Sequence, residues 1–412
     1  MGGSRFRLLA VIAVLLVVTA ACNRGAVGEG DSEDQEGPIK VALITDSAGA
    51  TSLFGVSNIN AVEMAVAELN ADGGVLGRDV ELSVKDSNSD PELGVKLTRE
   101  AVLEDEVSAI FGPVSSAVAV AMTDVAEQYE TPIFFHTSNT QTLTAENFHE
   151  YAFQVGPNTT MEGRANAIAL ADSPHKRWAV IAPDYEFGHL QSEAFIQKIQ
   201  ELNPEVEIVK KSYPPLGEKD FTSYITSTLA EKPDAVYGAL FAGDLITFTK
   251  QAQNLGFFDE VFFTSLYETD ALTALGDDAP EGVRGYSRAP FFAIDSSGID
   301  QFIEDYQAEH DSPPSDWAIM AYDAVKLWAA GVEEAGSTEP DDLVSALEGY
   351  EFESLRGPVT IRPEDHQASV PVYSGTVTFT DEYEFATWTD IQQTPGEEVW
   401  LSVEEVTELQ GQ

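Results

Sequence analysis

Residues 39–45 read IKVALIT and residues 80–86 read VELSVKD, two short runs that are typical of β-strands. Between them Ile59, Val62 and Val66 recur at helical spacing, so we expect an amphipathic helix with these side chains on one face. The unit then repeats as helix 91–104, strand 107–114, helix 116–129 and strand 132–137. Strands that alternate with helices predict a parallel sheet covered by helices on both faces.

A second series of the same kind begins after Gly156. The pattern predicts helices at 161–171, 190–202, 221–231 and 245–255, and strands at 177–184, 206–213, 234–240 and 261–265. The last third predicts helices at 299–310, 316–335 and 340–349 and strand-like runs at 358–362 and 371–379. That tail is too irregular for a third domain, so we expect it to complete the first two.

The sequence therefore predicts an α/β fold with two doubly wound, Rossmann-like lobes joined by a hinge that the chain crosses more than once. About 370 residues remain for folding, which exceeds what one hydrophobic core usually organises. We expect the N-terminal lobe to comprise 38–156 plus 290–355, and the C-terminal lobe 157–289 plus 356–405.

The N-terminal segment has the composition of an export signal. Arg5 and Arg7 precede an apolar run that is too short to span a bilayer comfortably, and small residues follow before Cys22. Thr19-Ala20-Ala21-Cys22 resembles the lipobox of prokaryotic lipoproteins, so we predict a signal peptide over 1–22 and a lipid anchor on Cys22. An ordinary secretory signal that happens to contain a Cys is the alternative. Residues 23–37 are acidic and predict a flexible linker.

The charge of the chain is extreme, with 70 Asp plus Glu against 22 Lys plus Arg and a formal net charge of −48. This excludes nucleic acid as a partner, because phosphate binding requires clustered Lys and Arg. Self-repulsion at this level is relieved when salt screens it, so we expect a halophilic setting. Acidic excess as a simple aid to solubility is the alternative. Without a cysteine after Cys22, no internal disulfide can form.

Common enzyme and metal-site motifs are absent from the sequence. We find no G-x-S-x-G, G-x-G-x-x-G, G-x-x-x-x-G-K-[ST] or H-E-x-x-H, and no two of the six histidines have i, i+4 spacing. We therefore expect no enzymatic activity, no cofactor and no metal site. A hydrolase remains an alternative that no motif supports.

Polar and aromatic residues follow several of the expected strands. GPVSS at 112–116 and HTSNT at 136–140 place hydroxyl groups at one sheet edge of the first lobe, while DYEFG at 184–188 and FAGD at 241–244 place rings at strand ends of the opposing lobe. In open α/β sheets, ligands bind beyond the carboxyl ends of the strands. Capping by Ser115 explains the first cluster equally well when it is taken alone. Two adjacent polar turns favour a small-molecule site, with Trp317 as a further candidate wall.

The whole chain from about 38 to 380 resembles the branched-chain amino-acid (Leu/Ile/Val)-binding family. The members of this family are extracytoplasmic solute receptors of ABC importers with the periplasmic binding protein type I fold. The resemblance rests on the order and spacing of IKVA at 39–42, FG at 54–55, AELN at 67–70, GGVLGR at 73–78, GPVSS at 112–116, DYEFG at 184–188, RGP at 356–358 and DH at 365–366.

The resemblance implies roles for several residues. Ser116 and Thr140 would hold the ligand carboxylate, and the carbonyl of Ser138 would face the ammonium. The position of the acidic residue that pairs with the ammonium falls at Ser265, with Glu268 and Asp270 just downstream. The aromatic walls would be Phe54, Phe187, Phe241 and Trp317. The family's disulfide positions are Ser89 and Ser115 here.

The function that the resemblance implies is binding of a branched-chain amino acid or a related small polar solute between the lobes. The partners would be ABC permease subunits and, through Cys22, the membrane on its outer side. A ligand-sensing receptor of the same fold for urea, amides or aromatic acids is the alternative. An extracellular enzyme is a weaker one.

Overall fold

The computed structural model describes residues 37–48 and 51–411. The expected signal peptide, Cys22 and all but the last residue of the linker lie outside these ranges. Within them, β1 (Ile39–Thr45), β2 (Val80–Asp86), β3 (Ala109–Phe111), β4 (Ile133–Phe135) and β5 (Ala152–Gln154) form a parallel sheet in the order β2-β1-β3-β4-β5. The sequence predicted β1 and β2 to the residue and did not predict β5.

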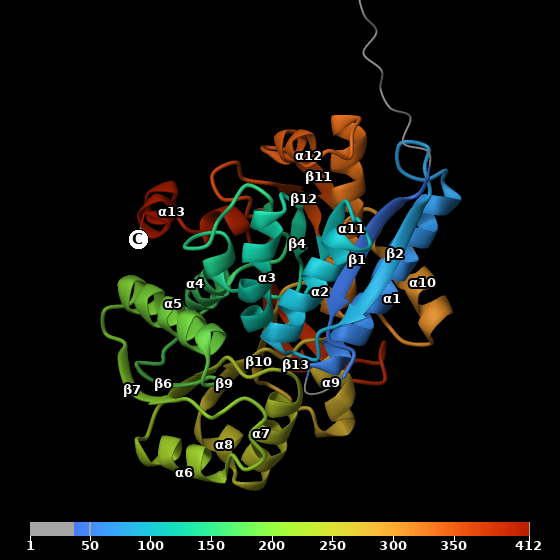
Figure 1. Cartoon of the computed structure of the whole chain (residues 1–412). Coiled ribbons are helices and arrows are strands. Elements are labelled where there is room, and N and C mark those ends of the chain that lie inside the picture. The colour runs from blue at the N-terminus through green and yellow to red at the C-terminus, as the bar shows by residue number, and fades with distance from the viewer. Residues whose placement is uncertain (1–36, 49–50, 412) are drawn as a thin grey trace, which may run out of the picture. The chain divides into compact units, whose positions relative to one another are not determined.

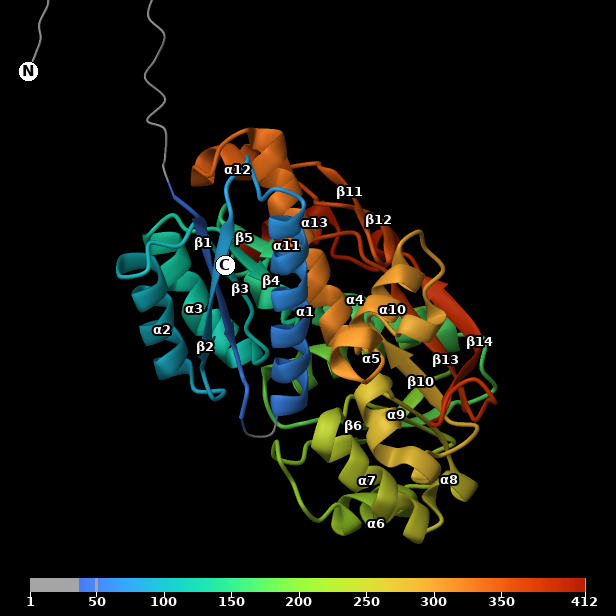
Figure 2. The ribbon, with the colours of Figure 1, turned by 90° about the vertical axis from the view of Figure 1, so that its right-hand side faces the viewer.

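Helices cover both faces of this sheet because its strands alternate between two buried faces. Val41 and Leu43 belong to the core under α1 (Ser52–Ala71), against which α11 (Asp316–Ala335) packs. Ala42 and Ile44 belong to a separate core under α2 (Pro91–Leu103) and α3 (Ser116–Gln128). Figure 2 shows α1 beside α11, with α10 (Ile299–His310) and α12 (Pro340–Leu347) nearby. We call this sheet with its helices lobe 1.

The second sheet runs in the order β14-β13-β10-β9-β8-β6-β7. Its strands are β6 (Arg177–Ile181), β7 (Glu207–Ser212), β8 (Ala235–Gly238), β9 (Phe262–Ser265), β10 (Arg284–Ser287), β13 (Val372–Thr378) and β14 (Thr387–Thr394). The order β7-β6-β8-β9-β10 repeats that of the first sheet, and β13 and β14 add an antiparallel edge. Its helices are α4 (Thr159–Leu170), α5 (Glu186–Leu202), α6 (Thr222–Ala230), α7 (Ala242–Asn254), α8 (Phe257–Glu260) and α9 (Thr269–Leu275) (Figure 1). We call this part lobe 2.

The described chain passes between the two sheets three times, after β5, after β10 and before β13. The third crossing follows the hairpin of β11 (Glu351–Ser354) and β12 (Gly357–Thr360). Buried ionic contacts hold this region, since Arg356 Nε donates to Asp323 of α11 at 3.0 Å and Nη2 donates to the Val155 carbonyl at 3.1 Å. The expected fold of two doubly wound lobes joined by several crossovers is confirmed, whereas the exact limits of each lobe stay a prediction.

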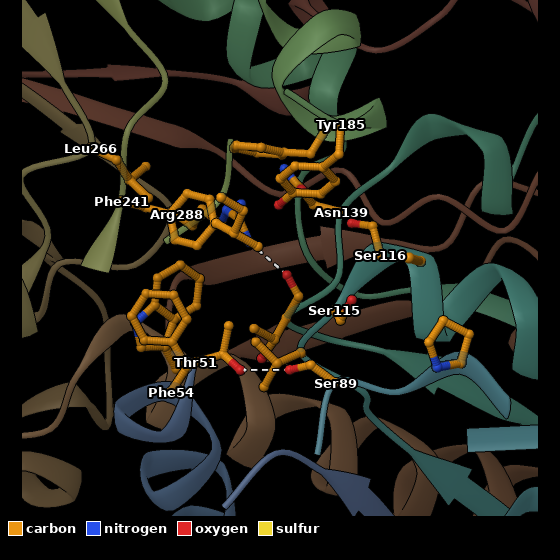
Figure 3. A pocket seen from close by; sticks show the side chains of 17 residues that line it. Thr51, Phe54, Ser89, Ser115, Ser116, Asn139, Tyr185, Phe241, Leu266 and Arg288 are labelled. Carbon is orange, nitrogen blue, oxygen red and sulfur yellow. Dashed lines mark hydrogen bonds between the residues drawn. The ribbon is translucent and has the colours of Figure 1, made fainter. Parts of the chain in front are cut away.

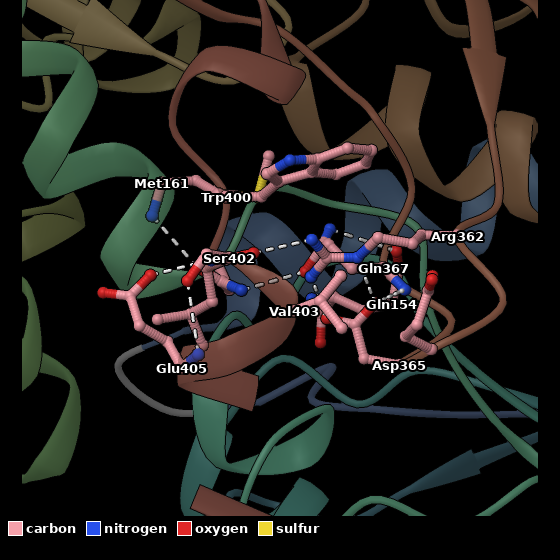
Figure 4. Close-up of polar contacts among 12 residues, drawn as sticks. Gln154, Met161, Arg362, Asp365, Gln367, Trp400, Ser402, Val403 and Glu405 are labelled. Atoms are coloured by element: carbon pink, nitrogen blue, oxygen red, sulfur yellow. Dashed lines mark hydrogen bonds and ion pairs between the residues drawn. The ribbon is translucent and has the colours of Figure 1, made fainter. Parts of the chain in front are cut away.

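The C-terminal segment folds back onto the third crossing (Figure 4). Arg362 binds Asp365 through two hydrogen bonds, donates to the Leu401 carbonyl at 2.6 Å and lies over the Trp400 ring at 4.3 Å. α13 (Val403–Gln410) then begins with a capping box between Ser402, its N-cap, and Glu405, the third residue of the helix. The residue pattern of the sequence did not predict α13, β10, β11 or β14.

Candidate functional site

A cavity of about 290 Å³ lies where the carboxyl ends of both sheets face each other. In each sheet the strand order reverses beside the first strand, between β1 and β3 in lobe 1 and between β6 and β8 in lobe 2. Ligands of open α/β sheets bind at such switch points. The residues that line the cavity follow these strands: Thr51 and Phe54 after β1, Ser115 and Ser116 after β3, Tyr185 and Phe187 after β6, and Phe241 after β8.

Glycines bring two of the aromatic side chains to the cavity. Gly55 and Gly188 lie in the first turns of α1 and α5, directly after Phe54 and Phe187. A Cβ atom at Gly55 would meet the Asp46 carbonyl oxygen at 1.9 Å, and one at Gly188 would meet the carbonyl oxygen of Pro183 at 2.0 Å. Each helix therefore starts in close contact with the strand end that precedes it, which places the neighbouring ring at the cleft.

Among the described residues, five aromatic side chains, contributed by both lobes, line the cavity (Figure 3). The ring centroids of Phe54 and Trp317 lie 4.1 Å apart, and those of Phe54 and Phe241 lie 6.1 Å apart. Phe241 in turn meets Phe187 edge to face at 5.4 Å, and Tyr185 stacks on Phe187 at 5.7 Å. The volume is at the lower end of the ~300–1,000 Å³ range of small-molecule pockets, so the cavity suits a small ligand with an apolar body.

Four helices of the described chain have their N-cap residue in the lining of the cavity, and the N-terminal amides of a helix carry partial positive charge. The N-cap residues are Thr51 of α1, Ser115 of α3, Tyr185 of α5 and Phe241 of α7. In none of the four does the cap side chain accept a hydrogen bond from its helix. Uncapped helix N-termini are ready-made sites for anions. The cavity therefore combines apolar walls with helix N-terminal amides, of which those of α5 and α7 also have an acid in the first turn, Glu186 and Asp244.

Arg288 is the charged side chain in the lining, and no Asp or Glu of the described chain belongs to that lining. It follows β10 and is 4% exposed. Its Nε donates to Glu162 Oε1 of α4 at 2.7 Å, and its Nη1 donates to the Thr137 carbonyl of lobe 1 at 2.6 Å. Burial raises the pKa of Glu162, and the charge of Arg288 opposes that rise. The ion pair therefore keeps a buried cation at the cavity.

Of the nine ligand-binding residues that the sequence predicted, the structure brings five together in the lining, namely Phe54, Ser116, Phe187, Phe241 and Trp317. The other four, Ser138, Thr140, Ser265 and Glu268, lie outside the lining. The Ser138 carbonyl accepts from Gln154 Nε2 at 2.8 Å, and the Thr140 hydroxyl donates to Glu186 Oε1 at 2.6 Å. The Ser265 hydroxyl donates to the Leu240 carbonyl at 3.1 Å.

Glu268 and Asp270, the acids expected near an ammonium group, are not part of the lining. Glu268 is fully buried, and neither of its carboxylate oxygens has a hydrogen-bond partner. Burial, followed by the charges of Asp270 and Asp316, raises the pKa of Glu268 well above its usual value. Burial and the charge of Asp316 raise the pKa of Asp270 to about 7. Both acids therefore hold protons more strongly than exposed carboxyls do.

Sequence reasoning missed several lining residues, notably Arg288, Asn139 and Tyr185. Asn139 and Tyr185 lie within the polar and aromatic turns that the sequence singled out, so their positions were visible although their roles were not. Arg288 follows β10, a strand of four residues that no period-2 pattern in the sequence predicted. Ser89 and Ser115, the positions of the family's disulfide, both line the cavity.

The model of the periplasmic binding protein family matches residues 38–382. The chain belongs to this family. The chain is 27% identical over 331 residues to the Leu/Ile/Val-binding protein BraC3 of Rhizobium johnstonii, covering 78% of this chain and 87% of that one. It is 22% identical over 319 residues to the leucine-, isoleucine-, valine-, threonine- and alanine-binding protein of Pseudomonas aeruginosa, covering 77% and 84%.

Solved structures of periplasmic binding proteins share the fold. A solute-binding protein of an ABC transporter from Rhodopseudomonas palustris, in complex with 3,4-dihydroxybenzoic acid, matches with a TM-score of 0.80 at 24% identity, covering 87% of this chain and 98% of that one. A periplasmic binding protein from Burkholderia mallei matches with a TM-score of 0.82 at 21% identity, covering 89% and 97%.

Two further observations concern the described residues. None of their helices is long and apolar enough to cross a membrane. They contain no group of three or more His, Cys, Asp or Glu side chains that is placed to hold a metal ion.

Proposed function

We propose that this chain is the extracytoplasmic substrate-binding component of an ABC importer, and that its ligand is a small carboxylate with an apolar body. The observation that carries the proposal is the cavity between the lobes, where aromatic walls meet four uncapped helix N-termini and a buried cation. Relatives are named as binders of branched-chain amino acids, and fold neighbours hold 3,4-dihydroxybenzoate, benzoate and 4-hydroxybenzoate. These ligands are all small carboxylates.

The carboxylate would bind at the start of α3. Ser115 and Ser116 line the cavity at that end, and the Ser115 side chain leaves the amides of the helix free. An anion at a helix N-terminus gains about 0.3–1 kcal/mol from the helix dipole, and up to about 2 kcal/mol where the site is partly buried. The rings of Phe54, Phe187 and Phe241 would enclose the apolar body of the ligand.

Binding would favour the closed arrangement of the two lobes, because the cavity takes its walls from both. A ligand that contacts both lobes shifts a pre-existing equilibrium between open and closed forms by its difference in affinity for the two. The permease subunits would then recognise the closed form.

The experiment that tests this function is a thermal-shift screen in high salt against branched-chain amino acids, aromatic acids, urea and short amides. We expect carboxylates to raise the melting temperature, and urea and amides to leave it unchanged. Ser116→Ala should weaken the binding of every carboxylate by about three- to tenfold, on the scale of one hydrogen bond. Ser138→Ala, in the same lobe but outside the lining, is the matched control. A protein that no carboxylate stabilises would contradict the proposal.

We further propose that the mature protein is held at the outer face of the membrane by a lipid on Cys22. The support is the lipobox-like sequence before Cys22 and the acidic linker after it, which gives the lobes room to reach a permease. Cys22→Ser should move the protein from the membrane fraction to the soluble extracytoplasmic fraction without changing ligand affinity. Retention of the variant in the membrane fraction would refute the anchor.

A further inference from the structure

Arg288 is fixed at the cavity by contacts on three sides. Besides the bonds from Nε to Glu162 and from Nη1 to Thr137, Nη2 donates to Glu162 Oε2 at 3.4 Å. The guanidinium also lies 4.9 Å from the centroid of the Trp317 ring. Glu162 is itself held, because it accepts from Asn139 Nδ2 at 2.6 Å. The cation is therefore held in place before a ligand arrives.

The guanidinium retains donors for a ligand. Arginine carries five N–H groups, and the contacts to Glu162 and Thr137 occupy three of them. Arg288 is 4% exposed and lines the cavity, so its remaining donors are largely removed from water (Figure 3). A hydrogen bond from a charged donor in such a setting is stronger than one between neutral groups.

We propose that Arg288 determines specificity by donating to an oxygen of the ligand and by disfavouring an ammonium group, so that the site selects carboxylates that lack an α-ammonium. This inference rests on the proposed function and narrows its ligand class. An α-ammonium in the cavity would meet a like charge and no lining carboxylate in the described chain. It would also lose hydration without a charge-assisted partner, which carries a large cost in a buried site.

The acids behind the cavity wall are the rival partners for an ammonium. Asp316 is engaged, since it accepts from the Ser287 hydroxyl, from the Ala289 amide at 2.9 Å and from the Thr269 hydroxyl at 3.1 Å. Glu268 is fully buried and lies outside the lining, so it reaches a ligand only if the wall rearranges.

The test compares ligands that differ only in the ammonium group. Isothermal titration calorimetry of the full chain would measure the dissociation constants of leucine and 4-methylpentanoate, and those of phenylalanine and 3-phenylpropanoate. The ratio within each pair gives the preference for the acid without the ammonium. We expect the acid without the ammonium to bind at least about tenfold more tightly in each pair, because a charge-assisted hydrogen bond corresponds to tenfold or more in affinity. This comparison needs no variant.

A double variant assigns the preference to Arg288. Arg288→Met with Glu162→Gln removes both charges together, because either change alone leaves a buried charge without its partner. In this double variant we expect the two dissociation constants of each ligand pair to differ by no more than about threefold. The matched control is Arg356→Met with Asp323→Asn, an ion pair at 3.0 Å that is equally buried and lies outside the lining. The control should keep the wild-type preference.

Three outcomes would overturn the inference. Tighter binding of leucine than of 4-methylpentanoate would show that the site accepts an ammonium. If Glu268→Gln then abolished this preference for leucine, Glu268 would be identified as the partner of the ammonium. An unchanged preference in the double variant would remove Arg288 as its cause. If no carboxylate binds at all, both the inference and the proposed function fail, whereas the first two outcomes leave the binding function intact.

Discussion

A pair of hydrogen bonds between lobe 1 and lobe 2 should stabilise the closed arrangement of the lobes. Glu186, the first residue of α5 in lobe 2, accepts from the hydroxyls of Thr140 and Thr142 in lobe 1 at 2.6 Å each. Neither Glu186 nor Thr142 lines the cavity. Because the donors and the acceptor belong to different lobes, these bonds are lost when the lobes separate.

The size of the effect follows from exposure. A hydrogen bond to a charged acceptor contributes about 1.5–3 kcal/mol when it is buried. Glu186 is exposed, so we reduce each bond to about 0.5–1 kcal/mol. Glu186→Ala should therefore weaken closure by about 1–2 kcal/mol, which corresponds to roughly 5- to 30-fold in the apparent dissociation constant. The effect should appear mainly in the dissociation rate and be equal for every ligand.

The assay is calorimetric titration combined with stopped-flow dissociation, for Glu186→Ala, Thr142→Val and the double variant. Once Glu186 is absent, removing the Thr142 hydroxyl should change affinity little further, so the two effects should be less than additive. Glu193→Ala is the control, because Glu193 lies on the same helix and pairs at 3.1 Å with Lys211 inside lobe 2. Affinity of Glu186→Ala within twofold of wild type, or full additivity, would refute the reasoning.

Three further predictions concern stability and the cavity wall. Burial and the charge of Asp316 raise the pKa of Asp270 from 3.8 to about 7, so between these values the native state binds a proton that the unfolded state releases, and stability falls as pH rises. Asp270→Asn should remove this loss of stability. The difference in unfolding free energy between the variant and wild type, measured by denaturant titration, should therefore be up to about 4 kcal/mol more favourable to the variant at pH 8 than at pH 4. Exposed Asp277→Asn should show no such difference between the two pH values. With a net charge of −48, the melting temperature should rise between about 0.1 M and about 2 M salt, and a flat profile would exclude a role for screening. Phe241→Ala should weaken ligand binding about tenfold or more by calorimetry, through lost ring contact, while Phe258→Ala, a half-buried ring of the same lobe outside the lining, should not.

The fold was predictable because periodicity reports burial directly. β1, a nearly continuous run of buried residues, and β2, in which apolar and polar residues alternate although only Val80 is fully buried, were predicted to the residue. β5 has three residues and β10 has four, too few to show a period of two, and they exist because neighbouring strands supply their hydrogen bonds. Strands this short therefore escape a local analysis, whether they lie at a sheet edge, as β5 does, or inside the sheet, as β10 does.

The sequence predicted those residues of the candidate site whose position depends on a single strand and the turn after it. Ser116 and Phe54 line the cavity because each lies in the first turn of the helix that follows a strand at the switch point. Thr140 also follows a strand, yet its hydroxyl contacts Glu186, a partner set by how the other lobe approaches. Arg288 depends on three segments far apart in the chain, since Glu162 and Thr137 hold it. No spacing in the sequence records such contacts.

The helices around the cavity lack side-chain hydrogen bonds at their N-caps, which connects the stability of the free protein to ligand binding. A capping side chain at a helix N-terminus contributes about 0.5–2 kcal/mol, yet the caps of α1, α3, α5 and α7 supply no such bond. Tyr185 and Phe241 are side chains with no carboxylate or amide oxygen to offer, and both face the cavity instead. The free protein thus forgoes capping energy at these four positions. Under the proposed function, a ligand anion held between the lobes would satisfy amides of α3 and would be attracted by the dipoles of the other helices, so this stabilisation would become available only on binding and closure.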